Sequence, residues 1–111
     1  VREAIEQAFA ALRRQPDSAP TSGALGMVLH AHQLFTPAKL AYQRAAALDR
    51  KAANWPYYLA DILHQEGKLE EARTMLAQAE PLPGAPPSTS LRLAEWALAA
   101  GDLPAAELWY Q

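Results

Sequence analysis

Small and apolar residues recur along the chain at helical spacing, in short segments that prolines and glycines separate. Alanine, the strongest helix former, occurs 25 times in 111 residues, and 9 prolines divide the chain. Only two Val, two Ile and four Thr are available to a sheet. The pattern therefore predicts short, closely packed helices, which we expect at residues 2–14, 21–33, 37–49, 55–66, 69–80, 88–100 and 103–111.

Local signals at the segment ends support these helices. Thr36 before a proline is a favourable helix start, and Asp102 offers the same kind of N-cap. Gly67 and Gly101 suit the turn that follows a helix. Because the connections are short, neighbouring helices are expected to be antiparallel. The longer break at residues 81–87 is interpreted as a rigid turn rather than a domain linker.

The same residue types return every 34 residues, which indicates internal repeats. Three such series share one register. One series is alanine, the second is leucine followed by a small residue, and the third is a larger side chain. Their members are Ala38, Ala72 and Ala106; Leu25, Leu59 and Leu93; and Tyr42, Leu76 and Tyr110. The register continues through the break at residues 81–87, so the whole chain forms one array.

This pattern resembles the tetratricopeptide-repeat (TPR) motif, in which two antiparallel helices carry a Leu-small pair, a Gly turn, an alanine and an aromatic residue. The resemblance implies an all-α, right-handed α-solenoid. Residues 1–18 match the second helix of a preceding repeat, 19–52 and 53–86 match repeats, and 87–111 match an incomplete one. Pro56 and Ala97 depart from the motif at single positions. We expect an interior piece of a longer array, with uncapped ends.

Most motif residues are expected to be structural. A side chain larger than alanine at Ala38 or Ala72 would push paired helices apart, and Leu59 and Leu63 are expected to be buried. Each helix pair has too narrow an apolar face to fold alone, so burial must come from stacking on its neighbours. Function is therefore sought outside the motif positions.

Composition narrows the function classes. The formal net charge is -2 and the pI about 5.9, which disfavours nucleic acid as a partner. The absence of cysteine excludes disulfides, thiolate catalysis and Cys-based metal sites. No apolar run approaches the roughly 20 residues of a membrane helix. These features predict a soluble protein without a membrane span, and they leave open a cytoplasmic or a periplasmic location.

The candidate binding residues come from the resemblance. In TPR arrays the first helix of each repeat lines a concave groove, and its groove-facing positions vary between proteins. Here those positions are Met27, His30, Ala31, Tyr57, Asp61, His64, Gln65, Leu91, Glu95 and Leu98. We expect Met27, Tyr57, Asp61, His64 and Glu95 to share one continuous surface.

The charge of this groove predicts the kind of partner. Asp61 and Glu95 occupy the same position in adjacent repeats and would repel a partner's C-terminal carboxylate. An apolar or basic peptide is the better match. The alternative is that both carboxylates simply form a solvated face.

A metal site was considered at His30 and His64, which are 34 residues apart, with Asp61 one turn before His64. Equivalent positions in stacked repeats lie roughly 10 Å apart, too far to share one ion. We therefore expect neither a metal nor another cofactor, and His32 is expected at the surface.

Catalysis is not expected either. Ser22 lies near the histidines in sequence, but no third group orients it as a nucleophile. Among the neighbouring aromatic residues we expect Tyr58 to be buried and Tyr57 to face the groove. A platform of these aromatic rings for a sugar or peptide is the less favoured alternative.

Two function classes remain. The first is a non-catalytic protein–protein interaction scaffold that docks a peptide or protein segment in the concave groove. The second is an architectural spacer or self-assembly segment of a larger multi-domain or envelope protein. Leu108, Trp109 and Tyr110 near the C-terminal end would then allow self-association.

Overall fold

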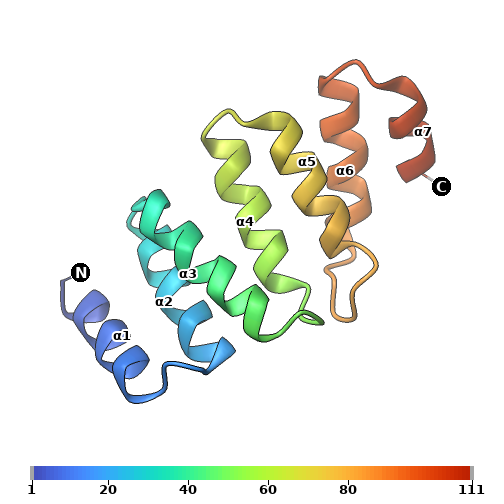
Figure 1. The fold of residues 1–111 in the computed structure, drawn as a ribbon. Helices are drawn as coiled ribbons and strands as arrows, with labels where there is room; N and C mark the ends of the chain where they lie inside the picture. The colour runs from blue at the N-terminus through green and yellow to red at the C-terminus, as the bar shows by residue number, and fades with distance from the viewer. Residues whose placement is uncertain (1, 111) are drawn as a thin grey trace. The chain divides into compact units, whose positions relative to one another are not determined.

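The computed structural model describes residues 2–110, and every regular element in that range is an α-helix (Figure 1). The helices are α1 (Arg2–Arg14), α2 (Ala19–Ala31), α3 (Phe35–Leu48), α4 (Asn54–Gln65), α5 (Leu69–Ala79), α6 (Ser88–Ala99) and α7 (Leu103–Tyr110). The prediction of an all-α fold is confirmed. None of these helices combines the length and the apolar character needed to cross a membrane.

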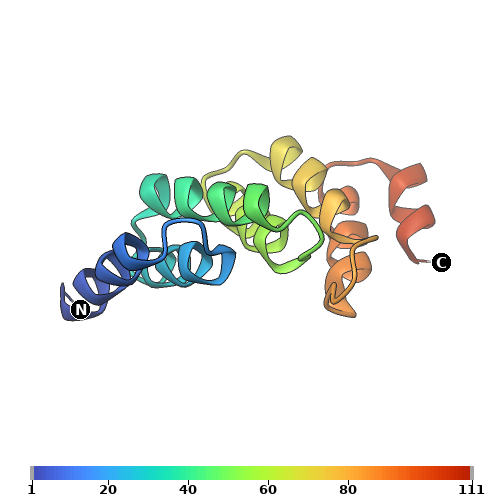
Figure 2. The same ribbon diagram turned by 60° about the horizontal axis from the view of Figure 1, so that its bottom comes forward.

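The chain divides into two compact units, residues 1–51 (unit 1) and residues 52–111 (unit 2). In unit 1, α2 packs against both α1 and α3, and in unit 2 each helix from α4 to α7 packs against the next. Consecutive helices within a unit run in opposite directions (Figure 1). Figure 2 shows that α3 lies over α2 in unit 1. In unit 2, α5 lies above α4 and α6 in the same view.

The residues of the 34-residue series form the core of each unit. Ala38 and Ala72 have no exposed surface and Ala106 is 2% exposed. The leucine series is also buried, at 4% for Leu25 and 2% for Leu93. The expected burial of the motif residues, including Leu59 and Leu63, is confirmed. These side chains hold the helices together and are not available to a partner.

The large residue of the series differs between the helix pairs. Tyr42 is 1% exposed because its ring lies against Gly26, where an added Cβ would meet ring atoms at 2.6 and 2.7 Å. Tyr110, at the same position of the α6–α7 pair, is 57% exposed. Its neighbour there is Ala94, which carries the Cβ that Gly26 lacks, so a ring cannot lie as Tyr42 does. Tyr110 and Leu108 are thus exposed, as we expected of these residues.

Two helices begin earlier than expected. Helix α2 begins at Ala19, because Ser18 Oγ accepts a hydrogen bond from the Thr21 backbone N–H at 3.2 Å. Helix α3 begins at Phe35, so Thr36 lies inside the first turn and is not the N-cap that we predicted. The proline after Thr36 does not mark the start, since the first-turn N–H groups of a helix have no intrahelical partner in any case.

The turns between paired helices repeat the same geometry. Gly67 and Gly101 have positive φ angles of 80° and 78°, as the sequence predicts for residues that end a helix. Gln33 occupies the equivalent position with φ of 60°, and its N–H donates to the His30 carbonyl at 2.9 Å. Asp102 is the N-cap that we expected, because its Oδ1 accepts a hydrogen bond from the Ala105 N–H at 3.2 Å.

Candidate protein-interaction surface

In unit 1 the candidate residues lie on α2 and have different surroundings. Met27 is 48% exposed and offers an apolar side chain to solvent. His30 is half-buried, and its Nδ1 lies 3.1 Å from the Tyr42 hydroxyl. Its ring also meets the rings of Phe35 and Tyr42 edge-on, at centroid distances of 6.1 and 5.8 Å. His30 therefore helps to hold Tyr42 in the core, and Met27 is the more accessible of the two.

In unit 2, three candidate residues of α4 contact α6. The Tyr57 ring lies 5.1 Å from the guanidinium carbon of Arg92. Asp61 Oδ1 lies 3.9 Å from Arg92 Nη1, and the His64 ring stacks on Trp96 at 4.3 Å with an interplanar angle of 8°. We refer to Tyr57, Asp61, His64, Arg92 and Trp96 as the α4–α6 cluster. The cluster fixes the predicted residues of α4 against the first helix of the next pair.

The exposed part of α6 forms a stripe beside this cluster. Leu91, Glu95 and Leu98 follow each other at intervals of four and three residues, so they lie on one helix face. Leu91 is 50% and Leu98 is 46% exposed, and Glu95 is exposed between them. Gln65 on α4 is also exposed, and its Nε2 donates to Asp61 Oδ2 at 2.8 Å. Unit 2 thus presents two leucines with an acidic side chain between them.

Arg92 and Trp96 were not among the candidates that the sequence suggested. Their positions in the repeat correspond to Tyr58, which we expected to be buried, and to Ile62, which is fully buried. The sequence does contain a sign of this cluster. Arg92 is one of only three Lys and Arg residues after residue 52, and it precedes Trp96 by one helical turn. Arg92 offsets the charge of Asp61, which leaves Glu95 as the exposed carboxylate of the pair.

The aromatic residues of α4 only partly match the expectation. Tyr58 is half-buried rather than buried, because Trp55, one turn earlier, occupies the buried position at 7% exposure. The Tyr58 ring lies 6.3 Å from the Trp55 ring and 6.0 Å from the Tyr57 ring. Tyr57 is half-buried as well, between Tyr58 and Arg92. Despite these contacts, Tyr57 stays partly exposed.

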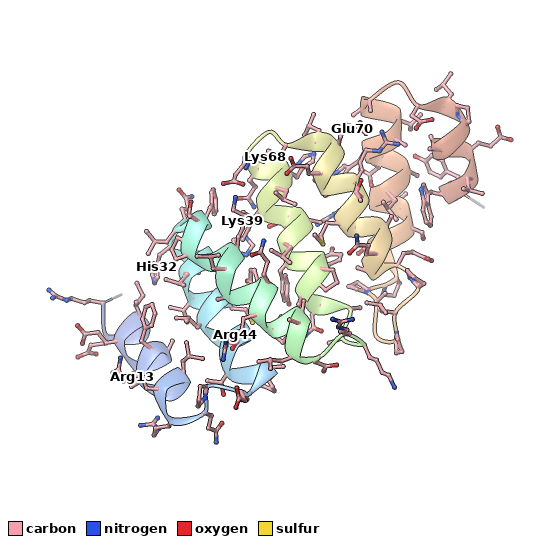
Figure 3. The ribbon with its side chains drawn as sticks, viewed as in Figure 1. Arg13, His32, Lys39, Arg44, Lys68 and Glu70 are labelled. Carbon is pink, nitrogen blue, oxygen red and sulfur yellow. The ribbon has the colours of Figure 1, made fainter. Side chains whose placement is uncertain are left out.

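A second polar cluster in unit 2 stabilises the fold. Arg73 on α5 donates to Asp102 Oδ2 at 2.8 Å and to Glu70 at 3.0 Å (Glu70 is labelled in Figure 3). The hydrogen bond from Arg73, together with that from the Ala105 N–H, holds the pKa of Asp102 below its ordinary value. The same bond raises the pKa of Arg73. Asp102 thus caps α7 and links it to α5.

The residues considered for other chemistry occupy unsuitable places. Ser22 is 1% exposed, so a substrate cannot reach its hydroxyl. His32 is half-buried at the end of α2 rather than fully at the surface. Within residues 2–110, no three His, Asp or Glu side chains come close enough together to hold one metal ion.

No family model and no curated protein matches this chain. Solved structures do match. A structure of MamA is 19% identical with a TM-score of 0.86, over 98% of this chain and 60% of that one. The chain spans about three fifths of the length of the MamA chains that it matches. PilF of Pseudomonas aeruginosa is 24% identical with a TM-score of 0.76, over 98% of this chain and 52% of that one.

A third similar structure contains a bound peptide. The type III secretion chaperone SycD of Yersinia enterocolitica, in complex with a peptide of the translocator YopD, is 23% identical with a TM-score of 0.73. The match covers 99% of this chain and 82% of SycD. MamA, SycD and PilF are TPR-type helical repeat proteins, so the fold of this chain is that of a TPR α-solenoid.

Proposed function

We propose that this chain is a non-catalytic scaffold segment that docks an apolar or basic peptide or protein segment on the first helices of its pairs. The observation that carries the proposal is the stripe of Leu91, Glu95 and Leu98 on α6. The fold does not need these side chains, because the motif residues of the same helix, such as Leu93 and Ala94, already form the core. Exposed leucines at helical spacing are typical of a surface that a partner covers.

The stripe also sets the chemistry of the partner. Full burial of a leucine is worth about 1.5–3 kcal/mol, and Leu91 and Leu98 are each about half exposed, so an apolar side chain over both gains roughly that amount in total. A Lys or Arg of the partner would pair with Glu95, which contributes mainly to specificity. Asp61 contributes less, since Arg92 lies 3.9 Å away.

The remaining candidate residues extend this proposal. Tyr57, His64 and Gln65 lie on α4 beside the stripe, with Tyr57 and His64 held by Arg92 and Trp96. Rings fixed in this way lose little freedom when a peptide covers them. In unit 1, Met27 offers an apolar side chain that is 48% exposed, and half-buried His30 is held by the Tyr42 hydroxyl.

Two further observations support a peptide as the partner. SycD, which shares the fold, was crystallised with a peptide of its translocator YopD. The exposed stripe of α6 is also long enough, at two helical turns between Leu91 and Leu98, to contact several residues of a peptide. A scaffold of this kind needs no catalytic group.

A second candidate function is a spacer or self-assembly segment, and the surface of α7 favours it. Leu103, Leu108 and Tyr110 are 65%, 62% and 57% exposed. A further copy or a neighbouring segment that packs on α7 would bury this surface.

Matched leucine substitutions distinguish the two functions. The chain is immobilised, its partners are captured from an extract of the source cells, and Leu91→Glu, Leu69→Glu and Leu108→Glu variants are compared. Leu69 is the control, because it is 48% exposed on the second helix α5. We expect Leu91→Glu to lose the captured partner and Leu69→Glu to keep it. Loss only in Leu108→Glu would refute docking on α6 and support the spacer function.

A further inference from the structure

Unit 1 has an apolar recess between α1 and α3. The recess has a volume of about 240 Å³. Phe9 and Leu12 of α1 form one wall, Leu40 and Ala41 of α3 form the other, and Leu25 of α2 lies at the floor. Arg44 is the one polar residue among those that line it. Since α1 and α3 are second helices, the proposed docking surface on the first helices does not include this recess.

The walls of the recess expose apolar surface that the fold does not require. Leu40 is 63% and Phe9 is 39% exposed, whereas Leu25 at the floor is 4% exposed. Leu40 therefore contributes little to the core of unit 1, and an apolar side chain placed in the recess would bury it.

The equivalent place in unit 2, 68 residues later in sequence, has a different character. The hollow between α5 and α7 is lined by Glu70, Arg73 and Thr74 as well as by Trp109. Trp109 stands where unit 1 has Ala41, and the hollow there has a volume of about 200 Å³ with polar as well as apolar side chains in its lining. The apolar recess is thus a property of unit 1 and not a general result of TPR packing.

Unit 1, which contains the recess, has a positive formal charge. Residues 1–51 contain seven Lys and Arg against four Asp and Glu, a formal charge of +3, whereas residues 52–111 contain three against eight, a charge of -5. Figure 3 labels Arg13 on α1 and Arg44 on α3. Arg13 follows Phe9 by four residues, so both lie on one face of α1.

Two acidic groups of this region, Asp17 and Glu6, are paired with arginines. Asp17 lies 3.6 Å from Arg44 Nη2, and Glu6 accepts a hydrogen bond from Arg2 at 3.2 Å. Arg44 also donates to the Pro16 carbonyl through Nε and Nη2, at 3.1 and 2.6 Å, which holds the guanidinium at the edge of the recess. An apolar ligand with acidic flanks would therefore match both the recess and its edge.

We propose that the α1–α3 recess is a second docking site, which takes an acidic amphipathic helix of a partner protein with a leucine or phenylalanine in the recess. Charge complementarity selects this occupant over a basic one, since Arg13 and the formal charge of +3 on residues 1–51 would repel Lys or Arg. The two surfaces of the chain then differ in preference: the stripe on α6 takes apolar or basic segments and the recess takes acidic ones.

The test is a titration of the ¹⁵N-labelled chain with two synthetic helical peptides. Both peptides carry leucines at positions i, i+3 and i+7, and their other positions carry Glu in one and Lys in the other. We expect the Glu peptide to shift the amide signals of Phe9, Leu40 and Ala41, with an affinity at least tenfold higher than that of the Lys peptide. Leu40→Glu and Arg13→Glu should each weaken binding of the Glu peptide at least tenfold.

The control variant is Leu91→Glu, which carries the same substitution on α6 and should leave binding of the Glu peptide unchanged. Loss of this peptide in Leu91→Glu, equal binding of both peptides, or no saturable shift at millimolar concentration would each overturn the proposal. Sedimentation adds a further outcome. If the chain forms a dimer that Leu40→Glu dissociates, the occupant is a second copy and the proposed partner is wrong. None of these results depends on whether a partner binds the stripe on α6.

Discussion

Gly26 and Tyr42 provide a sharp test of the packing in unit 1. A Cβ added at Gly26 would lie 2.6 Å from Tyr42 Cδ1 and 2.7 Å from Cε1. Carbon atoms in good contact are about 3.5–4.0 Å apart, so the ring must move. Tyr42 is 1% exposed and its hydroxyl lies 3.1 Å from His30 Nδ1, so movement breaks a buried contact. Gly26→Ala is therefore expected to destabilise unit 1.

The size of the effect follows from two opposing contributions. Overpacking of a buried position costs about 1–3 kcal/mol. Replacing glycine by alanine inside a helix gains about 0.5–1 kcal/mol, and Gly26 lies within α2. We therefore expect Gly26→Ala to lower the free energy of unfolding by up to about 2.5 kcal/mol.

Chemical denaturation of a double-mutant cycle measures this interaction. The partner substitution is Tyr42→Leu, because the double variant then has the Ala60 and Leu76 combination of unit 2, where both residues have no exposed surface. In the Tyr42→Leu background, Gly26→Ala should be neutral or stabilising, with an interaction energy of about 1–3 kcal/mol. Equal destabilisation by Gly26→Ala in both backgrounds would refute the reasoning.

Two further substitutions test unit 2. Asp102→Asn should lower the melting temperature at pH 7, because Arg73 and the Ala105 N–H stabilise the ionised carboxylate and lower its pKa. This stabilisation is present above the unfolded pKa of Asp102, about 4, and is lost as the pH falls through its lower folded pKa. The difference in melting temperature between wild type and Asp102→Asn should therefore disappear in acid. A difference that stays constant with pH would contradict this reasoning. Ala72→Leu should lower the free energy of unfolding by about 1–3 kcal/mol, because Ala72 has no exposed surface. Ala85→Leu, in a half-buried turn, should leave the melting temperature nearly unchanged. Equal melting temperatures for the two variants would argue against the 34-residue register.

The fold could be predicted because the repeat places the same physical requirement at the same position several times. Ala38, Ala72 and Ala106 are each buried, at 0%, 0% and 2% exposure, where a larger side chain would overpack the helix pair. Gly67 and Gly101 each end a helix with a positive φ angle. A single position of this kind would be weak evidence, but recurrence at a fixed interval makes the helix pairing readable without coordinates.

Features that depend on one specific contact could not be predicted. The close contact of the Tyr42 ring with Gly26 is one such feature, because the equivalent positions in the other helix pairs carry Ala60 and Ala94 instead of a glycine. Helix α3 begins two residues before its predicted start, because a proline is tolerated inside the first turn, where the N–H groups have no intrahelical partner.

The candidate surface was predicted in part for a related reason. Position in the motif identified the residues of α4 and α6 that are not needed for the core, and the stripe on α6 is exposed. Position could not show that Arg92 reaches across to Tyr57 and Asp61, or that Trp96 stacks on His64. Contacts between side chains of neighbouring repeats depend on rotamers and helix packing, which the spacing of residue types does not encode.

Site-specific photo-crosslinking in the source cells tests docking on the first helices most directly. A photoreactive phenylalanine derivative replaces Leu91 or Leu98 on α6, and in control proteins it replaces Leu69 on α5 or Leu48 on α3, which are 48% and 41% exposed. Docking predicts that the Leu91 and Leu98 positions form an adduct with the same partner and that the two control positions do not. Adducts of that partner at Leu69 or Leu48 alone would contradict the account.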